Sequence, residues 1–164
     1  MVPPLHPDLT PLEALVGTWS GEGEGEYPTI ETFRYVETIT FEHVGTPVLA
    51  YRQRTTAADD GRPLHAEAGY LRVPAPGTAE LVIAHPTGVT EVLEGFAAPN
   101  SAGPTDTVIV DVRSRHVGLT TTAKHVERVE RTWEVTGDVV RCTVRMSAVG
   151  QPLLHHLAAT LRRA

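Results

Sequence analysis

The sequence has little of what several protein classes depend on. It contains a single cysteine, Cys142, so a disulfide framework within one chain is impossible and a reducing compartment is expected. Acidic residues outnumber basic residues by 20 to 14. The resulting net charge of −6 argues against a surface that follows nucleic-acid phosphates or an anionic membrane, so we expect neither partner.

Targeting and membrane-spanning signals are also missing. The opening residues, MVPPLHPDLTP, have no positive region followed by an apolar core, so we expect no signal peptide. No apolar run approaches the length that spans a bilayer. These features predict a cytoplasmic protein, and the length of 164 residues suits a single domain over residues 1–164.

One helix is signalled near the N-terminus. Thr10 and Glu13 have the spacing of a capping box, Pro11 suits the first helical position, and Gly17 is placed to end the turn. The sequence therefore predicts a short helix that closes one end of the fold.

After this helix the hydrophobic pattern has a period of two, which is typical of half-buried β-strands. Short turns rich in Gly, Pro and Asp separate the segments, so strands adjacent in sequence are expected to pair antiparallel. Many short strands at this spacing predict an all-β sandwich or up-and-down barrel, and a barrel of about eight to ten strands can enclose one small ligand. The predicted strand segments are residues 30–43, 48–56, 81–84, 89–93, 107–116, 125–135 and 139–149.

The C-terminal residues 152–163 fit two interpretations. Four leucines at positions 153, 154, 157 and 161 fit one face of a helix, whereas alternation from His156 onward fits a closing strand. We favour a turn through residues 150–152 followed by a strand that begins near His156.

Glycine recurs at every second position in the first strand segment, at Gly21, Gly23 and Gly25, with another at Gly17. On a strand these glycines share one face and leave it bare, which lets a flat object or another strand approach closely. A bent or bulged strand would explain the spacing equally well. Phosphate-binding loops use other glycine spacings and precede a helix, so nucleotide binding is not indicated.

The segment GTWSGEGEGEYPT at residues 17–29 resembles the opening of the nitrobindin family, and similarity continues over nearly the whole chain, through HAEAG at 65–69 and QP at 151–152. The resemblance implies a ten-stranded antiparallel barrel, lipocalin-like or fatty-acid-binding-protein-like in architecture. It implies one non-covalent ferric heme b in the cavity mouth, nitric oxide binding after reduction, and isomerisation of peroxynitrite to nitrate. The sequence has no Cys-x-x-Cys-His motif, which excludes covalent heme attachment of the c type.

The resemblance also implies the heme ligand. The family has a His-Leu pair near the C-terminus, which places the axial and catalytic ligand at His156, followed by Leu157. His155 precedes it, and on a strand the two histidines point to opposite faces. A register shift of one residue would exchange their roles. Without the resemblance, a pair of surface histidines would be the preferred interpretation.

Two further heme contacts follow from the same matching. Thr29 and Lys124 align with family positions that contact the heme, whose propionates need hydroxyl or cationic partners at the rim. Lys124 is the only lysine in the chain, although a solvated loop lysine is an equally good interpretation.

His65 and Glu67 share one face of a predicted strand. A buried hydrogen-bonded network is the favoured interpretation, because no third ligand has a convincing spacing for a metal site. His43 is a weaker candidate for the distal side of the heme. The two tryptophans and the cysteine are expected in the core.

Two other functions are open. A carrier of fatty acids or other small apolar ligands would need an internal cation, for which Arg34, Arg52 or Arg54 could serve, and it would be colourless. An interaction module would form a homodimer through an exposed strand face, although the sequence marks no such surface. A hydrolase is disfavoured, because no Gly-x-Ser-x-Gly motif is present.

Overall fold

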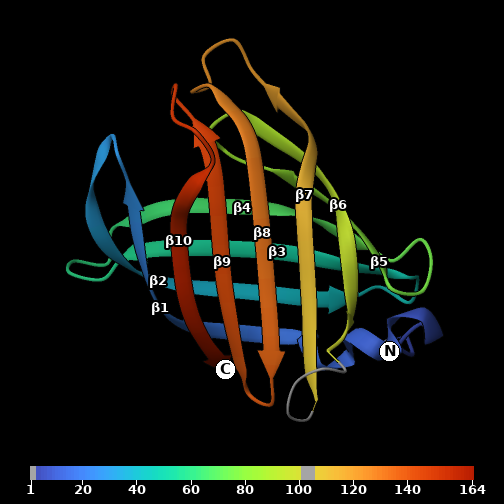
Figure 1. Ribbon diagram of the computed structural model, residues 1–164. Coiled ribbons are helices and arrows are strands. Elements are labelled where there is room, and N and C mark those ends of the chain that lie inside the picture. Colours follow the sequence, from blue (N-terminus) through green and yellow to red (C-terminus); the bar gives the residue numbers. More distant parts are fainter. Residues whose placement is uncertain (1–2, 101–105) are drawn as a thin grey trace.

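The computed structural model describes residues 3–100 and 106–164, in which the period of two is realised as ten antiparallel strands around a closed barrel (Figure 1). Each strand pairs with its neighbours in sequence, and β1 pairs with β10 to close the barrel. The predicted up-and-down barrel with a short N-terminal helix is confirmed. The strands are β1 (Gly17–Tyr27), β2 (Ile30–His43), β3 (Val48–Ala57), β4 (Pro63–Arg72), β5 (Thr78–Ala84), β6 (Val89–Pro99), β7 (Thr107–Leu119), β8 (Val126–Thr136), β9 (Val139–Ala148) and β10 (Leu154–Arg163).

The helix η1 (Pro7–Leu15) is a 3-10 helix, and it begins earlier than the capping box predicted. Its N-cap is His6, whose side chain accepts a hydrogen bond from the Asp8 N–H at 3.2 Å. The leucines at positions 9, 12 and 15 are all buried. A helix with three residues per turn stacks this spacing on one face, which explains why the tighter helix forms here.

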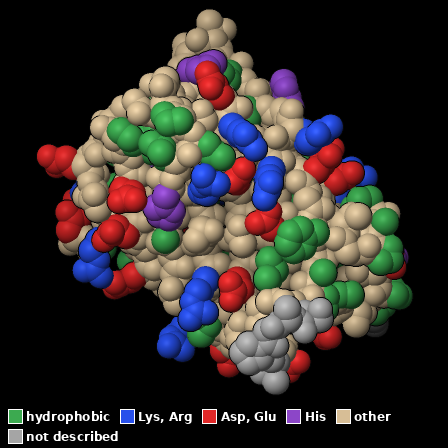
Figure 2. Space-filling model, in the orientation of Figure 1, with side chains coloured by type: hydrophobic (Ala, Val, Ile, Leu, Met, Phe, Trp, Pro, Cys, Tyr) green, Lys and Arg blue, Asp and Glu red, His purple; other side chains and the backbone are tan. Residues whose placement is uncertain are grey.

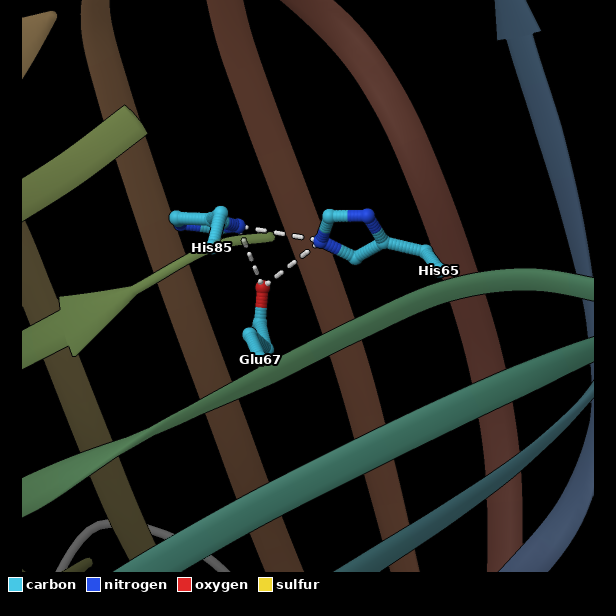
Figure 3. A group of neighbouring side chains, drawn as sticks. All are labelled: His65, Glu67 and His85. Atoms are coloured by element: carbon cyan, nitrogen blue, oxygen red, sulfur yellow. Dashed lines mark hydrogen bonds and ion pairs between the residues drawn. The ribbon is translucent and has the colours of Figure 1, made fainter. Parts of the chain in front are cut away.

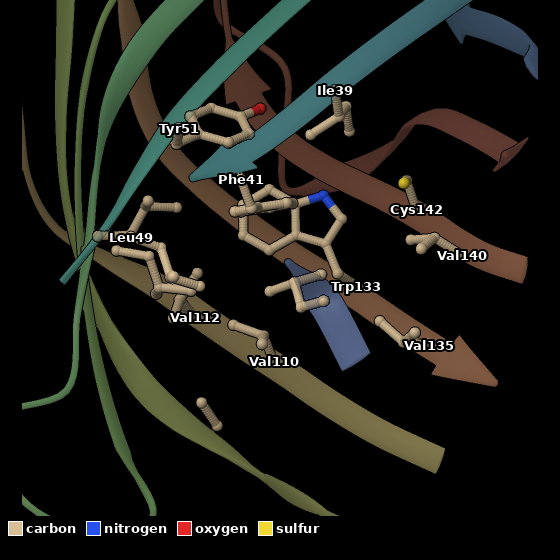
Figure 4. Packing of buried hydrophobic residues seen from close by; sticks show 14 of the residues in the cluster. Ile39, Phe41, Leu49, Tyr51, Val110, Val112, Trp133, Val135, Val140 and Cys142 are labelled. Carbon is tan, nitrogen blue, oxygen red and sulfur yellow. The ribbon is translucent and has the colours of Figure 1, made fainter. Parts of the chain in front are cut away.

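The apolar core fills the end of the barrel that η1 closes. The rings of Phe41, Tyr51 and Trp133 come from β2, β3 and β8, and their centroids lie 5.3–5.4 Å apart (Figure 4). Trp19 is fully buried, and its indole N–H donates to the carbonyl of Leu15 at 2.9 Å, which ties the helix to β1. The cysteine is also buried, so all three core expectations are confirmed.

The outer surface of the barrel carries charges of both signs. Figure 2 shows basic and acidic side chains interspersed over the face on which β7–β10 lie. Glu130, for example, accepts hydrogen bonds from Arg128 at 3.3 Å and Arg145 at 2.9 Å. Within residues 3–100 and 106–164, no helix combines the length and apolar character needed to cross a bilayer.

The glycines of β1 face the barrel interior, where other parts of the protein occupy the space beside them. A Cβ at Gly23 would lie 2.4 Å from the ring of Tyr35, and a Cβ at Gly25 would lie 2.3 Å from the ring of Phe33. At Gly21 a Cβ would lie 2.2 Å from the backbone oxygen of Thr160 on β10. The bare face therefore admits both flat rings and a neighbouring strand.

We predict that Gly23→Ala lowers the free energy of unfolding by about 1–3 kcal/mol, because the added methyl group forces the Tyr35 ring out of place. The matched control is Glu24→Ala, at the next position of β1, where the side chain is exposed; its effect should stay within about 0.5 kcal/mol. Urea denaturation followed by tryptophan fluorescence measures both variants. Equal effects would contradict the close packing inferred at Gly23.

Candidate functional site

A cavity of about 660 Å³ lies at the end of the barrel remote from η1, where β2, β4, β6 and β10 begin. Its volume falls within the range of roughly 300–1,000 Å³ typical of small-molecule sites. Its lining combines apolar side chains with polar and charged ones. The apolar side chains of its wall include Phe33, Leu64, Val126, Val144, Met146 and Leu157.

A β-bulge at the start of β10 decides which histidine lines this cavity. His155 and Leu157 pair with successive residues of β9, so His156 is an extra residue between them. Buried Leu161 has the same parity as His155, and an unbroken strand would therefore turn His155 inward. The bulge reverses this: His155 is exposed, and His156 lines the cavity.

His156 is held in a defined orientation. Its Nδ1 lies 3.0 Å from the carbonyl oxygen of Glu26. Because a carbonyl can only accept, Nδ1 carries the proton and Nε2 keeps a free lone pair. Burial lowers the pKa of His156, so the ring is neutral at pH 7, as a metal ligand must be.

Tyr27 packs against the His156 ring edge-on, with centroids 5.2 Å apart. The Tyr27 hydroxyl accepts from the Ala148 N–H at 2.9 Å and donates to the Met146 carbonyl at 3.1 Å. These bonds fix the tyrosine to the end of β9. Tyr27, from the Tyr-Pro-Thr segment, therefore limits rotation of the histidine.

Of the three other residues expected near the heme, one lines the cavity and two do not. Lys124 is exposed in the loop before β8 and lines the cavity. Thr29 is exposed in the turn between β1 and β2, next to the lining residue Ile30, and does not itself line the cavity. His43 lies at the far end of β2 from Ile30, so the weaker expectation of a role beside the heme is wrong.

A buried layer of polar side chains forms the floor of the cavity. Arg131 of β8 contacts Glu67 through Nη1 at 2.7 Å and Nη2 at 3.1 Å. It contacts Glu91 through Nε at 2.8 Å and Nη2 at 2.9 Å. Burial disfavours the charged forms of Arg131, Glu67 and Glu91. The attraction between the guanidinium and the two carboxylates outweighs this cost, so it lowers the pKa of both carboxyls and raises the pKa of Arg131.

Two histidines join this layer beside Glu67 (Figure 3). His65 lies on the same face of β4 as Glu67, as expected, and its Nε2 is 3.4 Å from Glu67 Oε2. His85, from the turn after β5, places Nδ1 3.3 Å from the same oxygen. The predicted network is confirmed. The expectation that no third ligand is placed beside His65 and Glu67 is wrong, because the β5–β6 hairpin brings His85 alongside β4.

The family described as THAP4-like, heme-binding beta-barrel domain matches residues 8–163 of the chain. The chain belongs to this family. It is 54% identical over 159 residues to a Nocardia farcinica protein named peroxynitrite isomerase, covering 97% of this chain and 92% of that protein. It is 52% identical over 161 residues to peroxynitrite isomerase 2 of Mycobacterium avium strain 104, covering 97% and 96%. A crystal structure of Rv2717c from M. tuberculosis has a TM-score of 0.92 at 45% identity, covering 98% of this chain and 99% of that chain.

The cavity suits the heme of this family. It offers a neutral imidazole with a free nitrogen at His156, an apolar wall for a flat macrocycle, and a cation at the rim in Lys124. It suits a fatty-acid carrier less well, because the cations proposed for that role, Arg34, Arg52 and Arg54, are all exposed outside the barrel.

Arg131 does not supply the internal cation that a fatty-acid carrier needs, since Glu67 and Glu91 already occupy its guanidinium. A fatty-acid carboxylate entering the cavity would have to compete with Glu67 and Glu91 for it.

Glu37 of β2 is a further buried carboxyl, next to the lining residues Tyr35 and Gln53. Its Oε1 accepts a hydrogen bond from Gln53 at 3.0 Å, and its Oε2 has no partner among the described residues. Burial raises the pKa of Glu37 from 4.5 to about 7. The folded protein therefore keeps a proton on Glu37 in a pH range where the unfolded chain has lost it.

We predict that Glu37→Gln removes a pH dependence of stability. The contribution of Glu37 to the free energy of unfolding is fully present below pH 4.5 and is lost as pH rises through about 7. Glutamine resembles the protonated form, so relative to the native chain the variant should gain up to about 3 kcal/mol from about pH 4 to pH 8. Denaturation at several pH values measures the difference. Glu42→Gln, an exposed position on the same strand, should show no such trend, and a flat difference for Glu37→Gln would contradict the buried proton.

Proposed function

We propose that the chain, as a single domain, binds one ferric heme b non-covalently through His156 and converts peroxynitrite to nitrate. The observation that carries the proposal is His156 itself, a neutral histidine on the wall of an apolar cavity with Nδ1 bonded to the Glu26 carbonyl. Membership of a heme-binding family, and relatives at 54% and 52% identity named peroxynitrite isomerase, support the same activity.

The chain's residues have defined tasks in this proposal. Peroxynitrite and nitrate contain the same atoms and charge, so the reaction needs no co-substrate. The heme, when bound, would supply the iron chemistry of the isomerisation, and His156 is the residue that would hold it. The Glu26 carbonyl keeps the proton on Nδ1 of His156, Tyr27 limits rotation of the ring, and Val144 and Met146 keep water from that wall.

Lys124 pairs with a heme propionate, and Thr29 contributes a hydroxyl from the β1–β2 turn. The reduced protein binds nitric oxide at the same position. The single cysteine fits a cytoplasmic location. Two copies of the chain form a homodimer through an exposed strand face.

We predict that His156→Ala abolishes heme retention while the barrel stays folded, because the axial bond is lost but the core lies at the other end. The matched control is His155→Ala, which removes the exposed neighbour and should keep heme. Absorption spectra and hemin titration measure binding, and circular dichroism checks the fold.

Stopped-flow decay of peroxynitrite, with nitrate quantified, then tests the activity. We expect the native chain and His155→Ala to catalyse the reaction and His156→Ala not to. Stoichiometric heme in His156→Ala would overturn the ligand assignment. A native chain that binds heme without accelerating nitrate formation would overturn the reaction.

We predict that Lys124→Ala raises the rate of heme dissociation only about two- to fivefold, because an exposed ion pair is screened by solvent. Lys124→Arg keeps the charge and should restore most of the difference. Transfer of hemin to an excess of apomyoglobin measures the rate. A rate identical in all three proteins would argue against a propionate contact.

A further inference from the structure

Three potential metal ligands converge at one point on the cavity wall (Figure 3). They are His65 Nε2, His85 Nδ1 and Glu67 Oε2. The two nitrogens lie 3.0 Å apart, and they lie 3.4 and 3.3 Å from the carboxylate oxygen, respectively. The three atoms thus form a nearly equilateral triangle.

The two sides of this triangle that meet at the carboxylate oxygen match the edges of a metal coordination tetrahedron, and the 3.0 Å side between the nitrogens is somewhat shorter. Zinc binds histidine nitrogen and carboxylate oxygen at about 2.0–2.2 Å, which places tetrahedral ligand atoms roughly 3.3–3.5 Å apart. Two histidines and one carboxylate are also a donor set that divalent zinc and iron favour. We propose that His65, Glu67 and His85 bind a divalent transition-metal ion of the zinc class, separate from the heme ligand His156.

The groups around the triangle orient the ligand atoms. Glu67 Oε1 accepts from the Tyr51 hydroxyl and from Arg131 Nη1, whereas Oε2 accepts from Arg131 Nη2 at 3.1 Å and is the oxygen that faces both histidines. His85 Nε2 lies 2.9 Å from Glu91 Oε1, although this approach is too poorly directed for a good hydrogen bond. A carboxylate beside the second nitrogen is the usual outer partner of a metal-binding histidine.

The charge of the floor also favours a cation. Two carboxylates, of Glu67 and Glu91, share the single guanidinium of Arg131 as their cationic partner in a buried layer. Side chains of both carboxylates are only 4% exposed, so water screens their charges weakly. A divalent ion beside Glu67 supplies a further positive charge, while Arg131 stays paired with Glu91 through Nε and Nη2.

The site is accessible. All three ligand residues line the cavity, so a bound ion keeps one side open toward that space for water or another small ligand. The His65 side chain is 33% exposed, which gives an ion a route from solvent. Its ring is bonded to His85 rather than to the core, and its loss should therefore disturb the fold little.

Zinc binding to the purified, tag-free protein tests the proposal, with heme content measured separately so that the result does not depend on the proposed heme function. Equilibrium dialysis against zinc, followed by elemental analysis, gives the stoichiometry, and competition with a chromophoric chelator gives the affinity. The variants are His65→Ala and His85→Ala. The control is His125→Ala, which removes an exposed histidine paired with Glu127.

We expect one zinc ion per chain, an affinity weakened by more than about tenfold in His65→Ala and His85→Ala, and no change in His125→Ala. Thermal unfolding without zinc checks each fold, and if His85→Ala does not fold, His65→Ala decides. No saturation at one ion per chain, or equal affinity in His65→Ala and the native chain, would overturn the site. Loss of binding in His125→Ala would assign the zinc to the surface instead.

Discussion

The double ion pair of Arg131 with Glu67 and Glu91 is the interaction on which the arrangement of this barrel depends. It joins β8 to β4 and β6 across the interior, and each charge is stable there only because the others are present. Along β8 the inward residues pass from Val129 on the cavity wall, through Arg131, to Trp133 in the core. The polar layer thus divides the interior into a dry half and a half that can take a ligand.

The same division is repeated on other strands. On β2, Glu37 lies between Tyr35 on the cavity and Ile39 in the core, and on β6 Glu91 precedes buried Leu93. Glu37 adds a carboxyl that keeps its proton when its neighbours have lost theirs. One layer therefore contains acids of widely different strength, because only two of its carboxylates share the guanidinium.

The fold could be predicted from the sequence because alternation and short turns are local signals, and they leave few topologies for ten short strands. The helix was placed too late because the capping box of Thr10 and Glu13 competes with the three-residue spacing of its leucines, and the spacing decided. Of the polar layer, only His65 and Glu67 were predicted, although the sequence also signals the rest. Glu37 and Arg131 occupy inward-facing positions of their strands. A search for apolar alternation does not detect polar residues at such positions.

The choice between His155 and His156 could not come from parity, because the parity of β10 indicates His155 and a bulge of one residue reverses it. Family resemblance selected His156, which lines the cavity, and its role as heme ligand stays a prediction. His85 was missed for a related reason. Its distance from Glu67 depends on the register of two hairpins, which no spacing along the chain reports.

The polar layer affects how this barrel can evolve. The residues that hold the fold together lie on one side of it, with η1 and the aromatic cluster, whereas the cavity wall lies on the other side. Substitutions in the wall can therefore accumulate without loosening the half that maintains the shape of the molecule. Such a barrel tolerates substitutions at one end. A pocket of new shape can therefore evolve there while the rest of the chain stays unchanged.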